Sequence, residues 1–220
     1  MIDYSVIIRT KNEDKWIEKC LISLCSQILK PAEIIIVDND STDNTLKIIK
    51  KFNCKIIKYN EKKFNYSKAI NIGIKKTRSE IVSILSAHCI PFDTYWAYHA
   101  LKGFSDKEIF AVYSRQIPTE STRNADHRDL FQVFRKQDSI QNNDIYFNNA
   151  SSFIRRDYWK KLNFNENING LEDIIWVKNF LKKGKKIFYS SESRVFHFHG
   201  INQNNNSKRL DRHIKILKKI

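Results

Sequence analysis

The chain has 220 residues, 41% of them hydrophobic and 12% aromatic, so its composition is that of a folded protein and excludes the disordered class. This length is typical of one domain with a sizeable core. No stretch approaches the roughly 18 consecutive apolar residues of a membrane span, and the first residues lack a basic segment followed by an apolar one. We therefore expect neither a signal peptide nor an integral membrane protein.

The chain is strongly basic, with 39 Lys and Arg against 24 Asp and Glu and a formal net charge of +15. Such a charge favours polyanionic partners such as phosphates, anionic lipids or nucleic acid, and by itself does not choose among them. No nucleic-acid-binding motif is present, so we expect no nucleic acid partner. The cysteines lack CxxC spacing and lie in apolar contexts where a free thiol packs as a small hydrophobe, which predicts free thiols in a reducing cytoplasm: Cys20, Cys25, Cys54 and Cys89.

Short apolar runs alternate with amphipathic segments in the first half of the chain. Strands are predicted at residues 4–9, 34–37, 55–59 and 81–85, and helices at residues 16–28, 46–52 and 67–76. Three successive β-α units imply right-handed crossovers, a doubly wound parallel α/β sheet, and a ligand crevice at the carboxyl ends of the strands. We expect residues 1–91 to bind a nucleotide.

The second half, residues 92–200, is less regular and is expected to bind an acceptor and carry catalysis. Helices are predicted at residues 94–104, 129–135, 157–162 and 173–183, and strands at residues 109–115, 147–155 and 186–189. Residues 201–220 end in a basic amphipathic helix whose apolar stripe is Leu210, Ile214 and Leu217. This helix is predicted either to lie on an anionic membrane surface or to pack on the domain.

Polar residues follow three of the predicted strands, at the point where a doubly wound sheet opens its crevice. They lie at residues 9–13, 38–40 and 86–88. Neither GxGxxG nor GxxxxGK[ST] follows the first strand, which excludes dinucleotide-dependent dehydrogenases and P-loop enzymes.

Several segments in their order along the chain resemble family 2 glycosyltransferases with the GT-A fold. Residues 5–13 are SVIIRTKNE and residues 33–45 are EIIIVDNDSTDNT. The resemblance continues through KAINIG at 68–73, LSAHCIP at 85–91, NNASSFIRR at 148–156, GLEDIIW at 170–176 and VFHFH at 195–199. It covers nearly the whole chain and implies a single GT-A domain, with a mostly parallel central sheet flanked by helices.

The resemblance implies that the first half binds a nucleotide-diphosphate sugar through Thr10, Asn12, Glu13, Asp38, Asp40 and Lys68. The first three lie near the base and ribose, and a carboxylate at Asp38 accepts hydrogen bonds from the base edge. Alternatively, Asp38 and Asp40 only end a strand and cap the next helix. Lys68 either binds the diphosphate or is a solvated helix lysine.

The chain departs from the family at residues 86–88, where most relatives have an Asp-x-Asp that binds Mg²⁺ or Mn²⁺. Ser86 and His88 stand in place of the two carboxylates, so metal dependence is open. His88 either ligates Mn²⁺ or donates a hydrogen bond directly to the diphosphate. Ser86 is expected to form a hydrogen bond with a phosphate or ribose oxygen. His197 and His199 alternate along a predicted strand and share one face, where they either complete a metal site with His88 or are ordinary histidines.

Glu172 and Asp173 precede a helix, where the helix dipole favours anions. The resemblance implies that Asp173 is the general base that deprotonates the acceptor hydroxyl and that Glu172 positions the acceptor or the base, whereas the structural alternative is a helix cap. Asn149 and Ala150 are expected at the floor of the sugar pocket. Trp176 either stacks on the acceptor or fills the core.

The predicted function is therefore inverting transfer of a sugar from a nucleotide-diphosphate donor to a hydroxyl of a surface glycan or lipid-linked saccharide. The enzyme is expected in the cytoplasm, at the inner membrane face if the basic helix binds lipid. The alternatives are a catalytically degenerate binding protein of the same fold, which the missing Asp-x-Asp favours, and a sugar nucleotidyltransferase, which the scarcity of glycine disfavours.

Overall fold

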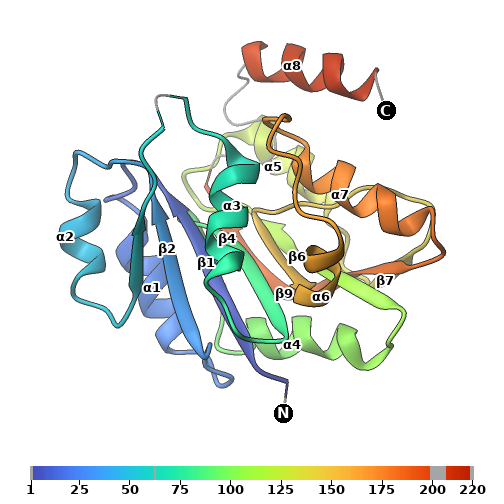
Figure 1. The fold of residues 1–220 in the computed structure, drawn as a ribbon, viewed down its shortest axis with the longest axis horizontal. Helices are drawn as coiled ribbons and strands as arrows, with labels where there is room; N and C mark the ends of the chain where they lie inside the picture. The colour runs from blue at the N-terminus through green and yellow to red at the C-terminus, as the bar shows by residue number, and fades with distance from the viewer. Residues whose placement is uncertain (1, 62, 199–206, 219–220) are drawn as a thin grey trace.

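The computed structural model describes residues 2–61, 63–198 and 207–218 and shows one sheet with helices on both faces (Figure 1). The sheet has nine strands in the order β3-β2-β1-β4-β8-β6-β9-β5, with β7 paired to β9. The strands are β1 (Tyr4–Thr10), β2 (Glu33–Asp38), β3 (Lys55–Lys58), β4 (Ile81–Ser86), β5 (Cys89–Pro91), β6 (Ile109–Ile117), β7 (Ser139–Gln141), β8 (Ser151–Arg155) and β9 (Lys186–His197). The helices are α1 (Ile17–Cys25), α2 (Thr45–Ile49), α3 (Tyr66–Lys75), α4 (Trp96–Lys102), α5 (Asn124–Val133), α6 (Arg156–Lys161), α7 (Glu172–Leu181) and α8 (Ser207–Leu217).

The first four strands form a parallel block, which confirms the predicted doubly wound arrangement. β1 pairs in parallel with β2 on one side and β4 on the other, and β2 pairs in parallel with β3. Arg9 is in register with Ser86, and Thr10 with Asp38. The polar residues that follow the apolar runs therefore meet at one edge of the sheet.

The second half extends this block with mixed pairing. β8 runs antiparallel to both β4 and β6, whereas β6 and β9 are parallel. The strand predicted at 147–155 begins only at Ser151, because residues 147–150 line a cavity in place of joining the ladder. The short strands β5 and β7 were not predicted. β7 pairs with the first part of β9, and β5 pairs with its last residues up to His197.

Two apolar cores lie on opposite faces of the sheet, as the alternation of side chains along β1 requires. Val6 and Ile8 pack with α1, α2 and α4, while Ile7 packs with α3, α6 and α7. Helix α3 lies close to β1 at Gly73, where an added Cβ would be 2.6 Å from Cγ2 of Ile7. A side chain at this position would push α3 off the sheet beside the cavity.

Two residues of the predicted apolar stripe of helix α8 face solvent. The side chains of Ile214 and Leu217 are 41% and 47% exposed, while the side chain of Leu210 lies outside the described part. His213 of α8 lies against the loop before α7, since a Cβ at Gly170 would lie 2.9 Å from its Nε2. None of the described helices combines the length and apolar character that crossing a bilayer requires.

The cysteines are free, as predicted, among the described residues. Cys20 and Cys89 are buried, but Cys25 is exposed at the end of α1 and so does not pack as a small hydrophobe.

Candidate active site

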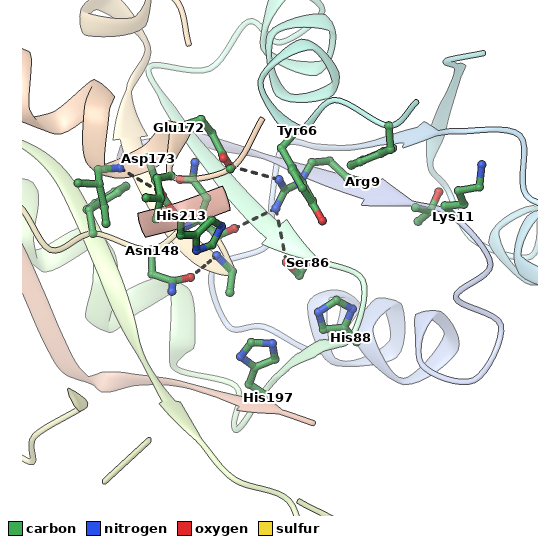
Figure 2. A pocket seen from close by; sticks show the side chains of 18 of the residues that line it. Arg9, Lys11, Tyr66, Ser86, His88, Asn148, Glu172, Asp173, His197 and His213 are labelled. Carbon is green, nitrogen blue, oxygen red and sulfur yellow. Dashed lines mark hydrogen bonds and ion pairs between the residues drawn. The ribbon is translucent and has the colours of Figure 1, made fainter. Parts of the chain in front are cut away.

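A cavity of about 450 Å³ opens at the carboxyl ends of β1 and β4 (Figure 2). The predicted site residues that line it are Thr10, Glu13, Ser86, His88, Asn149, Ala150, Glu172, Asp173 and His197. They come from both halves of the chain, so the cavity exists only because β8 and α7 pack beside the parallel block. Its two ends differ in chemistry: Glu172 and Asp173 lie at one end, and His88 and His197 lie at the other (Figure 2).

The carboxylate end is built at the start of α7. Gly170 and Leu171 have φ angles of 109° and 59°, a conformation that turns the chain abruptly into the helix. Oδ2 of Asp173 accepts a hydrogen bond from the backbone N–H of Asn149 at 3.0 Å, and Oδ1 accepts one from Ile174 at 2.9 Å. These bonds fix the carboxylate on the cavity wall and leave further lone pairs for a ligand.

The pKa of Asp173 is raised to about 7. Desolvation by burial raises it most, and the negative charge of Glu172 adds to this, while the two backbone N–H donors and Arg9 lower it. A carboxyl group with this pKa accepts a proton readily near neutral pH, which suits a general base.

Arg9 is a cavity residue that sequence reasoning did not assign a role. Its guanidinium lies 3.7 Å from Oε1 of Glu172 and donates to the backbone carbonyl of Asn149 at 3.4 Å and to Oγ of Ser86 at 3.5 Å. The ring of Tyr66 lies 5.3 Å from the guanidinium carbon. Its place at the end of β1, within the polar residues 9–13, was the signal that could have identified it.

Asn149 and Ala150, which were predicted at the floor of a sugar pocket, line the cavity in the segment before β8. Asn149 is 2% exposed, and its Oδ1 accepts a hydrogen bond from Oγ of Ser152 at 2.8 Å. Its Nδ2 has no hydrogen-bond partner among the described residues. A buried donor beside a cavity is costly unless a ligand or water satisfies it, so Asn149 favours a polar ligand here.

The histidine end lies between the turn after β4 and the end of β9. Oε1 of Glu13 lies 3.0 Å from Nδ1 of His88, and Oε1 of Gln116 lies 2.6 Å from Nδ1 of His197. The two imidazole rings stack at 5.3 Å with an interplanar angle of 14°. His199 lies outside the described residues.

Four predicted donor-binding residues do not line the cavity: Asn12, Asp38, Asp40 and Lys68. Asp38 is 1% exposed and accepts hydrogen bonds from Oγ1 of Thr10 and from N and Oγ of Ser41, at 2.8, 3.0 and 2.6 Å. Its carboxylate therefore holds the end of β1 and the segment after β2 together, and its assignment to the base edge stays a prediction.

The other three residues are also engaged elsewhere or face solvent. Oδ1 of Asn12 accepts from the backbone N–H of Thr42 at 2.8 Å, and Asp40 is exposed with a φ angle of 56°. Lys68 forms an ion pair with Glu61. The spacing of these residues in the sequence does not show which groups lie next to them in the fold.

Trp176 belongs to the core and does not line the cavity, which corrects its assignment to the acceptor site. It is 2% exposed, and its Nε1 donates to the carbonyl of Leu162 at 2.7 Å. The rings of Phe110, Phe164 and Phe180 surround it. The indole is thus enclosed by the core and is not available to a ligand in the cavity.

Further cavity residues were not predicted because they come from irregular segments or from the separate helix α8: Lys11, Phe64, Tyr66, Tyr146, Phe147, Asn148 and His213. His213 enters from α8 and lies near the carboxylate end (Figure 2). The carboxylate end of the cavity is therefore partly formed by α8.

Comparison with known proteins identifies the family. The model of glycosyl transferase family 2 matches residues 5–163. The O-antigen chain rhamnosyltransferase RfbN of Salmonella typhimurium is 25% identical over 207 residues, which are 89% of this chain and 66% of RfbN. The chain thus spans about two thirds of the length of this relative.

Solved structures show the same fold at lower identity. A TarS fragment from S. aureus in complex with UDP-GlcNAc superposes with a TM-score of 0.75 and 20% identity over 92% of this chain and 61% of that one. The mannosyltransferase PcManGT from Pyrobaculum calidifontis, in complex with GDP-Man and Mn²⁺, gives a TM-score of 0.71 and 20% identity over 88% and 56%. The fold is therefore that of GT-A glycosyltransferases.

Proposed function

Because the chain belongs to glycosyl transferase family 2, we propose that it moves a sugar from a nucleotide-diphosphate donor to a hydroxyl of a glycan or lipid-linked saccharide, with inversion. The observation that carries this proposal is the position of Asp173. Its carboxylate, with a pKa raised to about 7, lies in the same cavity as the polar ends of β1 and β4. A base and a nucleotide crevice are the two parts that direct displacement at an anomeric carbon requires.

Asp173 is proposed to take the proton from the acceptor hydroxyl as that oxygen attacks the anomeric carbon. The backbone donors of Asn149 and Ile174 hold the carboxylate in place, so little reorganisation is needed at the moment of transfer. Glu172 lies 3.7 Å from the Arg9 guanidinium, and its negative charge contributes to the raised pKa of Asp173. The buried Nδ2 of Asn149 is available to donate to a sugar hydroxyl.

The donor is proposed to lie against the ends of β1 and β4, where Thr10, Glu13, Ser86 and His88 line the cavity. Arg9 and Lys11 add positive charge along this wall, which favours a diphosphate. Asp38 contributes indirectly, because its hydrogen bond orients Thr10.

A divalent cation is proposed to be held by His88 and His197. A nitrogen of each ring faces the other, and both rings are oriented by oxygen acceptors, an arrangement that suits a metal ligand better than a solvated histidine. When bound, the cation would neutralise charge on the departing nucleoside diphosphate. Imidazole ligands favour Mn²⁺ over Mg²⁺, which prefers oxygen.

The acceptor is proposed to approach beside α8, with this helix on an anionic membrane. Ile214 and Leu217 are exposed one turn apart, and Lys215 and Lys218 are also exposed. Such a face inserts its apolar side chains among lipids while the lysines contact anionic head groups.

Co-sedimentation with vesicles tests the membrane contact. The wild type is expected to bind vesicles that contain phosphatidylglycerol and not purely zwitterionic ones, and the double variant Ile214→Ser/Leu217→Ser should lose binding. Ile22→Ser, which removes a 53% exposed side chain from α1, is the matched control. Equal binding by the double variant and the control would contradict the contact.

Donor binding is tested by thermal unfolding with UDP, GDP, dTDP, CDP or CMP, each with Mn²⁺, Mg²⁺ or EDTA. A ligand that binds only the folded state raises the apparent stability, by about 2.7 kcal/mol at a hundred times its dissociation constant. One nucleotide is expected to stabilise the chain selectively, and less so in EDTA. If no nucleotide shifts the unfolding temperature, the transferase proposal fails.

A further inference from the structure

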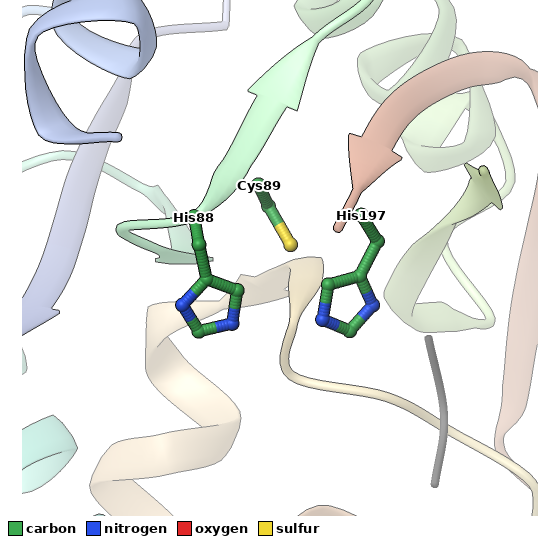
Figure 3. Close-up of side chains that lie close together, drawn as sticks. All are labelled: His88, Cys89 and His197. Atoms are coloured by element: carbon green, nitrogen blue, oxygen red, sulfur yellow. The ribbon is translucent and has the colours of Figure 1, made fainter. Parts of the chain in front are cut away.

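Three side chains at the histidine end have ligand atoms within 4.8 Å of one another: His88, Cys89 and His197 (Figure 3). The two rings turn a nitrogen toward each other, and the Cys89 sulfur lies between them in this view (Figure 3). Cys89 was predicted as a small apolar residue, and family resemblance assigned it no role. Its position between two histidines places its sulfur where it can serve as a metal ligand.

The strand pairing explains why these residues converge. β5 runs antiparallel to β9 with Cys89 in register with His197, so both side chains leave the same face of the ladder. His88 lies in the turn just before β5, outside the strand alternation that would otherwise send neighbouring side chains to opposite faces. The pairing of β5 with β9 and the turn before β5 therefore bring these three side chains together.

Both imidazoles are already oriented as metal ligands usually are. A carboxylate at Glu13 and an amide oxygen at Gln116 only accept, so Nδ1 of each histidine carries the hydrogen. The remaining ring nitrogen of each is then the metal-binding atom. Oxygen acceptors behind metal-bound histidines fix the tautomer and raise ligand basicity.

We propose that Cys89 is a third protein ligand, with His88 and His197, and that the site selects a thiophilic divalent cation such as Zn²⁺ over Mg²⁺. Tetrahedral Zn²⁺ takes nitrogen at about 2.0–2.1 Å and sulfur at about 2.3 Å, which brings ligand atoms closer together than the present limit of 4.8 Å. Rotation of the His88 ring toward the sulfur would bring the three ligand atoms close enough to bind one cation. On binding, the thiol proton passes to water and the sulfur bonds the cation as a thiolate.

The fourth position of such a cation faces the cavity. Cys89 is fully buried and does not line the cavity, whereas His88 and His197 do. The sulfur therefore lies behind the cation, and a donor phosphate oxygen or water completes the coordination in front. This inference rests on the proposed cation position and adds its third ligand and its metal preference.

The test is metal binding by the full-length chain without nucleotide, using Co²⁺ and Zn²⁺ as probes. Co²⁺ is expected to give a thiolate-to-cobalt charge-transfer band that Zn²⁺ abolishes by displacement. Cys89→Ser should lose the band and bind Zn²⁺ at least tenfold more weakly. Cys25→Ser, a control at an exposed thiol, should keep the band and the wild-type affinity for Zn²⁺. X-ray absorption of the Zn²⁺-loaded wild type should show one sulfur ligand, a result that does not depend on how the variants fold.

Absence of the band and of a sulfur ligand in the wild type would overturn the inference, as would an unchanged band in Cys89→Ser. The thermal-unfolding test with Mn²⁺ and nucleotide is independent of this result. Nucleotide binding without a sulfur ligand would refute the role of Cys89 alone, whereas loss of both would refute the proposed function as well.

Discussion

The two ends of the cavity hold their polar groups in different ways. At the carboxylate end, Asp173 is fixed by backbone donors, and burial next to Glu172 raises its pKa. At the other end, His88 and His197 are fixed by the side-chain oxygens of Glu13 and Gln116. A cation close to Asp173 would lower its pKa and weaken it as a base, so the separation of the two ends suits the proposed division between a base at one end and a cation at the other.

The largest effect should come from removing the base. Asp173→Asn keeps the shape of the side chain but cannot accept the acceptor proton, so we expect kcat to fall about 10²- to 10⁴-fold. Donor binding, measured by thermal unfolding with nucleotide, should change little because Asp173 lies at the other end of the cavity. Asp157→Asn, at an exposed carboxylate on α6, is the control. A variant with normal turnover would remove Asp173 from the mechanism.

The next effect should appear at the histidine end. Glu13→Gln replaces the carboxylate that orients His88, and loss of such a partner typically weakens metal binding about 10- to 100-fold. Cation affinity measured by calorimetry should fall by that factor, while Glu18→Gln, at an exposed partner of Lys51, should leave it unchanged. Equal affinities in both variants would mean that Glu13 does not support a metal ligand.

The pH dependence of turnover connects the carboxylate end to Arg9. Because the pKa of Asp173 is raised to about 7 and the base must be deprotonated, kcat should rise with pH through about 7. Arg9 lowers this pKa, so Arg9→Gln should move the midpoint to higher pH. Arg128→Gln, at an exposed side chain, should leave it in place. A midpoint that stays or moves to lower pH in Arg9→Gln would contradict the electrostatic role of Arg9.

The smallest effect concerns stability. The pKa of Asp173 is higher in the folded chain than its ordinary 3.8, so the folded state binds the proton more tightly and stability falls as pH rises from about 4 to 7. Asp173→Asn removes this dependence. The free energy of unfolding of the variant minus that of the wild type should therefore increase by at least about 1 kcal/mol as the pH rises over that range, since one pKa unit corresponds to 1.36 kcal/mol. Urea unfolding at pH 5 and pH 8 measures the change. A constant difference at both pH values would show that the pKa is not raised.

Most of the parallel block could be predicted from the sequence because its signals are local. The unbroken apolar run at 34–37 became β2, and the amphipathic segment at 67–76 became α3, capped where the side chain of Asn65 accepts from the backbone N–H of Lys68 at 3.0 Å. The polar strand ends also met as expected, since parallel strands bring their carboxyl ends to one edge. Thr10, Glu13 and Ser86 consequently line the cavity.

The prediction was weaker wherever a residue's role depends on a partner that is distant in sequence. Asp38 was assigned to the base edge, but the hydroxyl of Thr10 and the backbone of Ser41 occupy its carboxylate. Trp176 follows Asp173 by three residues and Glu172 by four, a spacing that places side chains on the same side of a helix, yet its ring is buried in the aromatic core. Its burial depends on the packing of Phe110 and Phe164, which are distant in the sequence.

The sequence by itself determined the β-α order, the crevice at the strand ends and the carboxylate pair at the start of a helix, because hydrophobic period and helix polarity act over a few residues. Only the tertiary structure decided that Arg9 lies near Glu172, that α8 turns Ile214 and Leu217 outward and His213 toward the cavity, and that Cys89 lies between two histidines. These outcomes depend on the pairing of β5 with β9 and on packing between distant segments, which no local pattern in the chain specifies.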